Sequence, residues 1–438
     1  MASITEYQGK NGLTYNITVY NGYDSNGKQI KARTTFVPDL TKSKRQQEKA
    51  IKEFVDNFER LVKKGQYWQA DKITLNDFVN MWRKNYAKEH FAASTLYSYN
   101  GHLDSLILPS LGKYKMIAIT PMVIQTFYNE LANAATTRIE GKKGGYTKNS
   151  ILKYHKILTS IFKFSVRMKL LEENPCQGVE IPKGKPVEVK PKFLTPDEAK
   201  RFLKMLDEPV ATQYECYYSN WERVITKVYT SQVENEYYRI MNKLFYVLAL
   251  VGGFRASELT ALTWKAINFE TSTITVYQAA AYGADGNYIK EPKTESSHRD
   301  VVLTEKEMTL LKEWKEKQKE LIKKLGTYWI GNKDLEANFI FTSKNGKMMC
   351  HGAPTRTLKK LITNYNSVVS ESEKLPVIST HKLRHTTASF LLSLNIDAKT
   401  IANRLGHKKV SVLFDFYIHA LKENDIKAAE ELSKMLDI

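Results

Sequence analysis

The sequence predicts a mixed α+β protein that is mainly helical. Three observations predict this class. Apolar residues recur at helical spacing through much of residues 71–180 and 193–438, whereas alternating segments rich in β-formers are confined to the first 37 residues and to residues 272–303. Residues 181–192 combine prolines and lysines as an extended linker does. We therefore expect a small sheet-plus-helix domain over 1–65, a helical domain over 71–180, and a larger, mainly helical domain with a small antiparallel sheet over 193–438.

The first domain is predicted from a hairpin and a helix. Residues 15–20 alternate, residues 29–37 provide a return strand, and two Asn-Gly pairs between them are turn signals. Thr41 is expected to cap a helix that runs to about Lys64. Cationic side chains on such a hairpin either enter a DNA groove or simply face solvent. The cations concerned are Lys28, Lys31 and Arg33.

The second domain is predicted to be helical throughout. Thr74, Thr120 and Thr147 each precede an apolar, helically spaced run and are expected N-caps, and Pro121 suits a first helical turn. Lysines cluster before and along its last helix, as a phosphate-binding face requires, although each alone could be an ordinary solvated residue. They are Lys142, Lys143, Lys148, Lys153 and Lys156.

The third domain is predicted to begin at Thr195-Pro196, a helix cap. Residues 244–254 form the longest apolar run, and its 11 residues fall short of the ~20 that cross a membrane, so a buried helix is expected. The β-rich patch lies among these helices. Its predicted strands are 272–278, 288–290 and 299–303.

Charge indicates a polyanionic partner. The formal net charge is +19, and residues 1–185 alone hold 29 Lys and Arg against 16 Asp and Glu. That excess fits nucleic acid or an anionic membrane surface, and composition does not choose between them. The cysteines, Cys176, Cys216 and Cys350, form neither a disulfide framework nor a CxxC metal site, so a reducing cytoplasm is expected. The sequence contains no GxxxxGK phosphate loop with the serine or threonine that must follow its lysine, and no GxGxxG fingerprint.

Five segments of the third domain carry cationic or nucleophilic groups. Gly252-Gly253 allows a tight turn that would present Arg255 at a helix start, and Lys293 falls between two predicted strands. His381 and Arg384 share one face of a helix start, since they are three residues apart. The remaining segments contain His407 and Tyr417.

A zinc site on the same helix is disfavoured. His381 and His385 are four residues apart, but Lys382 replaces the glutamate of a zinc-protease helix and Arg384 would repel a cation. No metal is therefore expected.

Taken in order, the five segments resemble the tyrosine recombinase (phage integrase) family. That family has an arginine in an R-x-S-E helix start, a lysine in a β-hairpin loop, H-x-L-R-H, L-G-H, and a tyrosine followed two residues later by histidine. In this sequence the matching segments are Arg255 to Glu258, Lys293, His381 to His385, Leu405 to His407, and Tyr417 with His419.

The resemblance implies an organisation for the whole chain. Residues 1–65 are similar to an arm-site DNA-binding domain, a three-stranded sheet plus a helix, and residues 71–180 to a helical core-binding domain. Residues 193–438 are then the catalytic domain. The implied partners are double-stranded DNA with core-type and arm-type sites, three further copies of the chain in a tetramer, an excisionase and a host DNA-bending protein. The implied location is the nucleoid of a bacterial host cell, with no membrane association.

The resemblance also implies roles for six residues. Arg255 and Arg384 would clamp the non-bridging oxygens of a phosphodiester, Lys293 would protonate the leaving 5′ oxygen, and His381 would accept or relay the nucleophile's proton. His407 would bind the phosphate or support the pocket, and Tyr417 would form a 3′-phosphotyrosine on the way to a Holliday junction. Because the covalent intermediate conserves the bond energy, no cofactor is expected.

Two positions depart from the family pattern, and two other functions stay open. Residues 208–240 are longer than the usual spacer, and Leu413 stands where threonine is common. A type IB topoisomerase shares much of this chemistry, and a non-catalytic architectural DNA-binding protein could keep the scaffold. The tail, residues 422–438, has apolar residues at helical spacing and is expected to pack on its own catalytic domain or on a neighbouring protomer.

Overall fold

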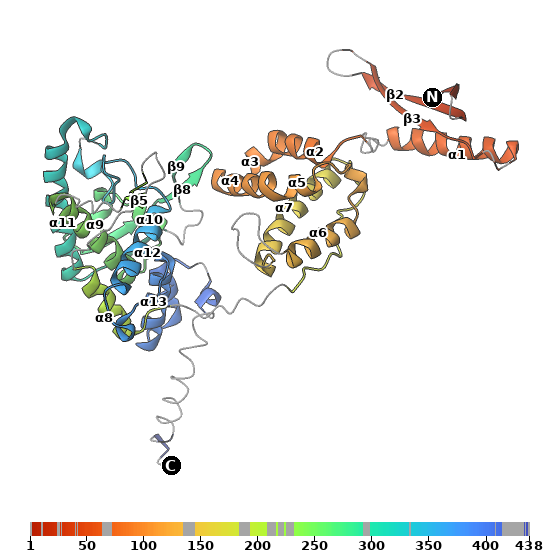
Figure 1. The fold of residues 1–438 in the computed structure, drawn as a ribbon. Coiled ribbons are helices and arrows are strands. Elements are labelled where there is room, and N and C mark those ends of the chain that lie inside the picture. Colours follow the sequence, from red (N-terminus) through yellow and green to blue (C-terminus); the bar gives the residue numbers. More distant parts are fainter. Residues whose placement is uncertain are drawn as a thin grey trace. The chain divides into compact units, whose positions relative to one another are not determined.

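The computed structural model contains two compact units, residues 1–188 and 189–438 (Figure 1). The fold is mainly helical with small antiparallel sheets, which confirms the predicted class. The predicted linker spans the boundary between the units, and almost all of the tail lies outside the described residues. The structure describes residues 2–9, 12–23, 27, 29–39, 41, 43–63, 72–134, 145–183, 193–207, 216–217, 223–224, 232–291, 298–332, 334–407, 409–413, 433, 435 and 436.

The chain begins with a three-stranded antiparallel sheet and a helix, the form that the resemblance implied. The sheet has the order β1-β2-β3, and Ile17, Val19 and Ala32 on one face form a core with Val55 and Phe58 of the helix. The elements are β1 (Ala2–Gly9), β2 (Gly12–Tyr23), β3 (Gln29–Phe36) and α1 (Lys44–Lys63).

The opposite face of this sheet carries two of the predicted cations. Lys31 pairs with Tyr20 across the strands and Arg33 pairs with Thr18, so these residues alternate with the buried ones. Lys31 Nζ lies 5.4 Å from the centre of the Tyr20 ring. Lys31 and Arg33 are exposed, whereas Lys28 lies outside the described residues.

The start of α1 corrects the sequence prediction. The helix begins at Lys44, so Thr41 lies two residues before the N-cap position and is no cap; its hydroxyl donates to Asp39 (2.6 Å). Ser43 is the residue that bonds across the first turn, with its backbone N–H and hydroxyl both directed to the side-chain oxygen of Gln46. A serine with a glutamine three residues later satisfies the first turn better than the more distant threonine.

The second domain of the prediction is helical as expected. Thr74, Thr120 and Thr147 accept the backbone N–H three residues later, so all three predicted caps are confirmed. π-helical turns join α2 to α3 and α4 to α5. The helices are α2 (Leu75–Trp82), α3 (Lys88–His90), α4 (Ala93–His102), α5 (Leu108–Leu111), α6 (Pro121–Asn133) and α7 (Lys148–Arg167).

Helix α7 separates its apolar and cationic residues. Ile151, Tyr154 and Ile157 are buried in the core of this helical region, while Lys153 and Lys156 face solvent. Lys148 is exposed in the first turn, and Lys142 and Lys143 lie outside the described residues. The described lysines of the predicted cluster therefore belong to one solvent-facing side of a helix. The division of unit 1–188 into two domains stays a prediction.

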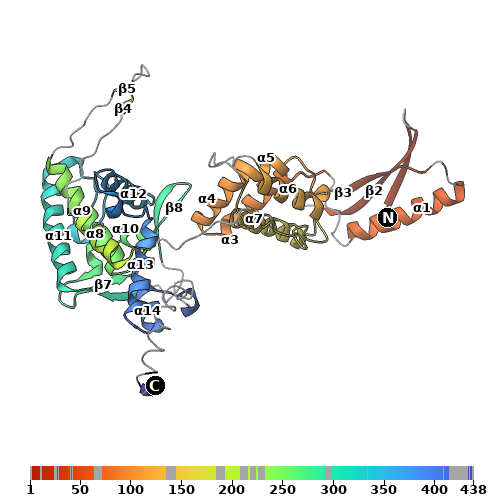
Figure 2. The same cartoon turned by 60° about the horizontal axis from the view of Figure 1, so that its bottom comes forward.

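The second unit is built around the predicted buried helix. Helix α9 packs against α11 and α13 (Figures 1 and 2), and its residues Leu244 and Leu248 are fully buried. Thr195 caps the first helix as predicted. Within the described residues, no helix is long and apolar enough to cross a membrane. The helices are α8 (Pro196–Met205), α9 (Gln232–Val251), α10 (Ala256–Thr260), α11 (Glu305–Leu325), α12 (Ala353–Asn366), α13 (Thr380–Ser393) and α14 (Ala398–Leu405).

The β-rich patch forms a three-stranded sheet in the order β10-β7-β6 and a separate β8-β9 hairpin. Strand β8 was not predicted, because three consecutive alanines have low β-propensity; they form a strand here since small side chains fit the buried space beside α10. Lys293 falls between β9 and β10 in sequence, outside the described residues. The strands are β4 (Cys216–Tyr217), β5 (Arg223–Val224), β6 (Ile267–Asn268), β7 (Thr273–Val276), β8 (Ala279–Gly283), β9 (Gly286–Lys290) and β10 (Arg299–Val302).

Candidate active site

The carboxyl end of α14 binds three arginines through its backbone. The carbonyl oxygens of residues 404–406 accept, in that order, from Nε of Arg299 (2.8 Å), Nη2 of Arg384, and Nη2 of Arg255 (2.9 Å). The last carbonyls of a helix lack partners within the helix and lie at the negative end of its dipole, so they favour cations. This helix end therefore gathers side chains from three distant parts of the chain.

Gly406 makes this arrangement possible. It ends α14 in the left-handed conformation, with φ of 64°, and its N–H and that of His407 return to Asn403 and Ala402. A Cβ at this position would lie 3.0 Å from Nη1 of Arg299. The Leu-Gly-His segment thus ends a helix, leaves room for an arginine and turns His407 back toward the same helix end.

Arg255 is placed by the predicted Gly-Gly turn. Gly253 has φ of 66°, and a Cβ there would overlap Cδ2 of Leu405, so only glycine fits. Arg255 is the N-cap residue of α10, and its backbone N–H donates to Oε2 of Glu258 (2.8 Å). Its side chain is 33% exposed, enough to meet a ligand from solvent.

Glu258 joins two of the arginines beneath the surface. Its side chain is 5% exposed and accepts from Nη1 of Arg255 (2.6 Å) and from Nη1 and Nη2 of Arg299 (3.1 and 2.8 Å). Burial would raise the pKa of this carboxyl, but the hydrogen bonds and charge of Arg299, with the charge of Arg255, outweigh burial and lower the pKa to about 2. The carboxylate is therefore ionised at neutral pH.

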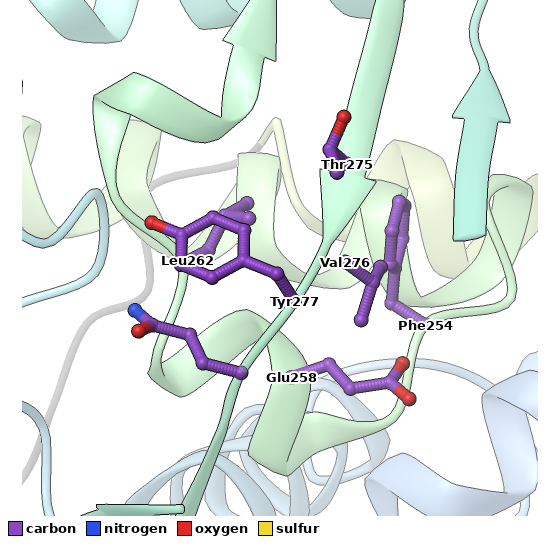
Figure 3. Close-up of a pocket in the computed structure, with 7 residues that line it drawn as sticks. Phe254, Glu258, Leu262, Thr275, Val276 and Tyr277 are labelled. Atoms are coloured by element: carbon purple, nitrogen blue, oxygen red, sulfur yellow. The ribbon is translucent and has the colours of Figure 1, made fainter. Parts of the chain in front are cut away.

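The far side of Glu258 is closed by the protein interior. Figure 3 shows its side chain beside Phe254 and Val276, at a cavity of about 10 Å³. That volume is close to the least that holds one water molecule, so no substrate group enters from this side. Of the three arginines, Arg255 is the one whose side chain is exposed to a ligand within the part of the chain that the structure describes.

Arg384 comes from α13 and is 2% exposed. Besides its bond to α14, its Nη1 donates to the carbonyl of Gly253 (2.7 Å). Burial first, and then the charge of Arg255, lower its pKa to about 9. Arg384 thus stays cationic at neutral pH and ties the Gly-Gly turn to the helix end.

Three histidines border the arginines and are neutral at pH 7. His381 is exposed in the first turn of α13, and partial burial of the ring, followed by the charges of Arg384 and Arg255, lowers its pKa below 6.5. The same causes lower the pKa of His407 to about 4, and its Nδ1 has no hydrogen-bond partner among the described residues. The pKa of His385, whose ring lies 4.5 Å from that of His381, is lowered to about 3, chiefly by burial.

The structure brings four of the six predicted residues together: Arg255, His381, Arg384 and His407. The other two, Lys293 and Tyr417, lie outside the described residues. Among the described residues no cluster of three or more potential metal ligands occurs.

Sequence reasoning missed one member of the cluster, Arg299. It was assigned only to a strand, and no motif marked it. The available signal was alternation, because Arg299 and the buried Val301 are two residues apart and so lie on the same, inward face of β10. A cation on that face requires a buried partner, and Glu258 provides it.

Comparison with known proteins identifies the family. The model of the phage integrase family matches residues 222–424, and the model of the phage integrase N-terminal SAM-like domain matches residues 74–132. The tyrosine recombinase XerC-like protein of Caldanaerobacter subterraneus subsp. tengcongensis is 25% identical over 99% of this chain and 100% of the relative. The ICEBs1 integrase of Bacillus subtilis is 25% identical over 80% of this chain and 79% of the relative.

Solved structures agree on the fold. The Tn1549 transposon integrase, in complex with transposon right-end DNA, superposes with a TM-score of 0.58 at 20% identity, covering 82% of this chain and 100% of the other. A complex of the same integrase with circular-intermediate DNA gives a TM-score of 0.59 at 19% identity, with 82% and 100% coverage. The chain therefore belongs to the phage integrase family of tyrosine recombinases, enzymes that cleave and rejoin DNA strands.

Proposed function

We propose that this chain is the integrase of a phage or conjugative element, which recombines two specific DNA sites through a 3′-phosphotyrosine and a Holliday junction. The observation that carries the proposal is the convergence of Arg255 and Arg384 with neutral His381 and His407 at the end of α14. Cations beside neutral bases suit the transfer of a negatively charged phosphoryl group by a hydroxyl nucleophile.

Arg255, which is 33% exposed, would bind the phosphate directly, and the buried Arg384 would stabilise the transition state through its charge. Attack on a phosphodiester places extra negative charge on the non-bridging oxygens, which guanidiniums bind well. A guanidinium has five donors, and described residues take two from each of these side chains. Donors of Arg255 therefore remain for a phosphate at its exposed side.

His381 would act as the base. A tyrosine hydroxyl has an ordinary pKa of about 10, so attack by Tyr417 requires that its proton be accepted or that a cationic field stabilise the phenolate. His381 is exposed and neutral at pH 7, and the two arginines whose charges depress its pKa are those proposed to stabilise the negative charge of the phosphate. As the Tyr417 oxygen bonds to phosphorus, the bond to the 5′ oxygen breaks and that oxygen takes a proton from Lys293.

The remaining parts of the chain would bind DNA. Residues 1–65 are proposed to bind an arm-type site through the sheet face that bears Lys31 and Arg33, and residues 71–180 a core-type site through the α7 lysines. Residues 193–438 are the proposed catalytic domain. The names of the relatives, an ICE integrase and a transposon integrase bound to DNA, support a mobile element as the source. A tetramer, an excisionase and a DNA-bending protein complete the proposed assembly in the bacterial nucleoid.

Replacement of the nucleophile tests the proposal most directly. Tyr417→Phe should abolish the covalent protein–DNA complex on a nicked suicide substrate while core-site binding is retained, since only the attacking oxygen is removed. The measurement is the fraction of DNA that stays bound in SDS. Tyr328→Phe, which alters an exposed tyrosine of the same unit (80% exposed), is the control and should form the complex normally.

An SDS-stable complex formed by Tyr417→Phe would show that another residue is the nucleophile. Relaxation of a plasmid without any attachment site, by the unmodified chain, would instead favour topoisomerase activity.

Lys293→Ala should slow cleavage by about 100-fold or more, the usual range for removal of a general acid. A substrate with sulfur in place of the bridging 5′ oxygen should restore most of the rate, because a thiolate leaves without a proton. Single-turnover rates on both substrates provide the measurement, with Lys290→Ala as the matched control. An equal deficit on the sulfur substrate would assign the acid to another group.

The cleavage rate should decline as the pH falls, with the midpoint of this decline below pH 6.5. Cleavage requires neutral His381, its folded-state pKa lies below 6.5, and the neutral fraction therefore decreases only as the pH falls through that lower value. His381→Gln should lower the plateau by at least about 100-fold and remove this acid limb. A decline centred at or above pH 6.5 in the unmodified chain would contradict the role of His381.

Lys31→Ala/Arg33→Ala should weaken arm-site binding and its dependence on salt. Each phosphate that is no longer neutralised reduces the slope of log K against log salt by roughly 0.9, so the slope should change by about 2. The control, Arg45→Ala/Lys52→Ala, removes the same charges from exposed positions of α1 and should leave the slope unchanged. Equal changes in the two variants would argue against binding through this sheet face.

A further inference from the structure

We propose that Arg299 is a positioning residue for cleavage: it holds the guanidinium of Arg255 toward the phosphate through Glu258 without touching DNA itself. The inference rests on the proposed function and extends it to a residue outside the six predicted positions. It rests on the hydrogen bonds by which Arg255 and Arg299 share the buried carboxylate of Glu258.

Arg299 and Arg255 differ in access. The side chain of Arg299 is 6% exposed and that of Arg255 is 33% exposed, although both contact Glu258. Only Arg255 can therefore reach a ligand from solvent. Arg299 therefore acts on the reaction through the residues that it contacts and through its charge, which also helps to lower the pKa of His407.

Both oxygens of Glu258 are fully used. Oε1 accepts from Nη1 of Arg255 (2.6 Å) and Nη1 of Arg299 (3.1 Å), while Oε2 accepts from the backbone N–H of Arg255 (2.8 Å) and Nη2 of Arg299 (2.8 Å). Arg299 thus holds the carboxylate in the fork geometry, and Arg255 is limited to a single side-chain bond.

Because Arg299 occupies part of the Glu258 carboxylate, the Arg255 guanidinium keeps donors for a phosphate. A guanidinium beside an unshared carboxylate prefers two parallel bonds, which would draw Arg255 into the interior and use up donors that a phosphate needs. By occupying Oε2, Arg299 prevents that pairing. It also lowers the net attraction of Glu258 for Arg255, since the carboxylate is already paired with a cation.

A second contact of Arg299 has the same effect. Its Nε donates to the carbonyl of Arg404 (2.8 Å), which directly precedes the carbonyls of Leu405 and Gly406 that hold Arg384 and Arg255. Arg299 therefore fixes both the carboxylate and the helix end against which Arg255 is placed. Phe254, with its ring centre 5.8 Å from the Arg299 guanidinium, further restricts this side chain.

A double-mutant cycle in the full-length chain tests the proposal. Single-turnover cleavage of a core-site suicide substrate is measured for the unmodified chain, Arg299→Gln, Arg255→Ala and the double variant. Displacement of a catalytic group by about 1 Å costs about 100-fold, so Arg299→Gln should slow cleavage by about that factor in the natural background. In the Arg255→Ala background the same change should cost less than about threefold, because the group that it positions is already absent.

Arg404→Gln is the matched control. The Arg404 side chain also joins the end of α14 to its surroundings, donating to the carbonyls of Val302 (3.2 Å) and Val251 (3.3 Å) without contacting Glu258. Its replacement should therefore lower cleavage by the same factor in both backgrounds. Equal losses from Arg299→Gln in the two backgrounds would assign Arg299 a purely structural role and overturn the proposal.

A modified substrate gives a readout that a general loosening of the structure would not alter. A methylphosphonate at the scissile position replaces one charged non-bridging oxygen by a methyl group, which reduces the need for a guanidinium. The deficits of Arg299→Gln and Arg255→Ala should both shrink on this substrate by similar factors, whereas that of Arg404→Gln should not. A deficit of Arg299→Gln that stays undiminished would overturn the proposal.

Arg299→Lys guards against a failure to fold, and Tyr417→Phe separates a failure of this proposal from a failure of the proposed function. If Arg299→Gln does not fold, Arg299→Lys retains the charge but cannot form the fork, and it should show the same dependence on Arg255. An SDS-stable complex that survives Tyr417→Phe would overturn the proposed function and this role together. A complex that depends on Tyr417, with equal losses from Arg299→Gln in both backgrounds, would overturn only the role of Arg299.

Discussion

The active-site architecture depends on one constraint: three consecutive carbonyls at the end of α14 must each receive an arginine. These arginines come from the turn before α10, from β10 and from α13, segments separated by up to 129 residues in the chain. No apolar contact could fix three cations at one point, because burial alone would disfavour their charges. A helix end does so through oriented dipoles and unpaired acceptors, with Gly406 providing the turn that exposes them.

The protonation states follow from the same cluster. Three guanidiniums face one carboxylate, so the surroundings are cationic, and a cationic field beside partly buried rings favours neutral histidine. The arginines that would bind a phosphate thereby also keep nearby bases unprotonated. One electrostatic arrangement supplies both conditions that attack by a hydroxyl needs: a stabilised anion and an available base.

Most features that depend on residues close together in the sequence could be predicted from it. The fold class, the threonine caps and the Gly-Gly turn before Arg255 all rest on contacts within a few residues, and the structure confirms them. Contacts between distant segments were harder to predict. Arg299 belongs to the site through Glu258, 41 residues away, and through the carbonyl of Arg404, 105 residues away. The alanines of β8 form a strand beside α10, which packs against them. The Thr41 cap was wrong because the helix begins at Lys44, which leaves Thr41 two residues before the N-cap position.

Glu258 neutralises only one of the three arginines, and this imbalance has a thermodynamic consequence. In the absence of DNA the chain keeps like charges close together in a poorly solvated place, which the depressed pKa of Arg384, about 9, reflects. Folding therefore proceeds against a local repulsion that the proposed phosphate would relieve. Activity and thermal robustness would then be opposed at the exposed Arg255: its loss removes a repelling charge, while Glu258 keeps both of its bonds to Arg299.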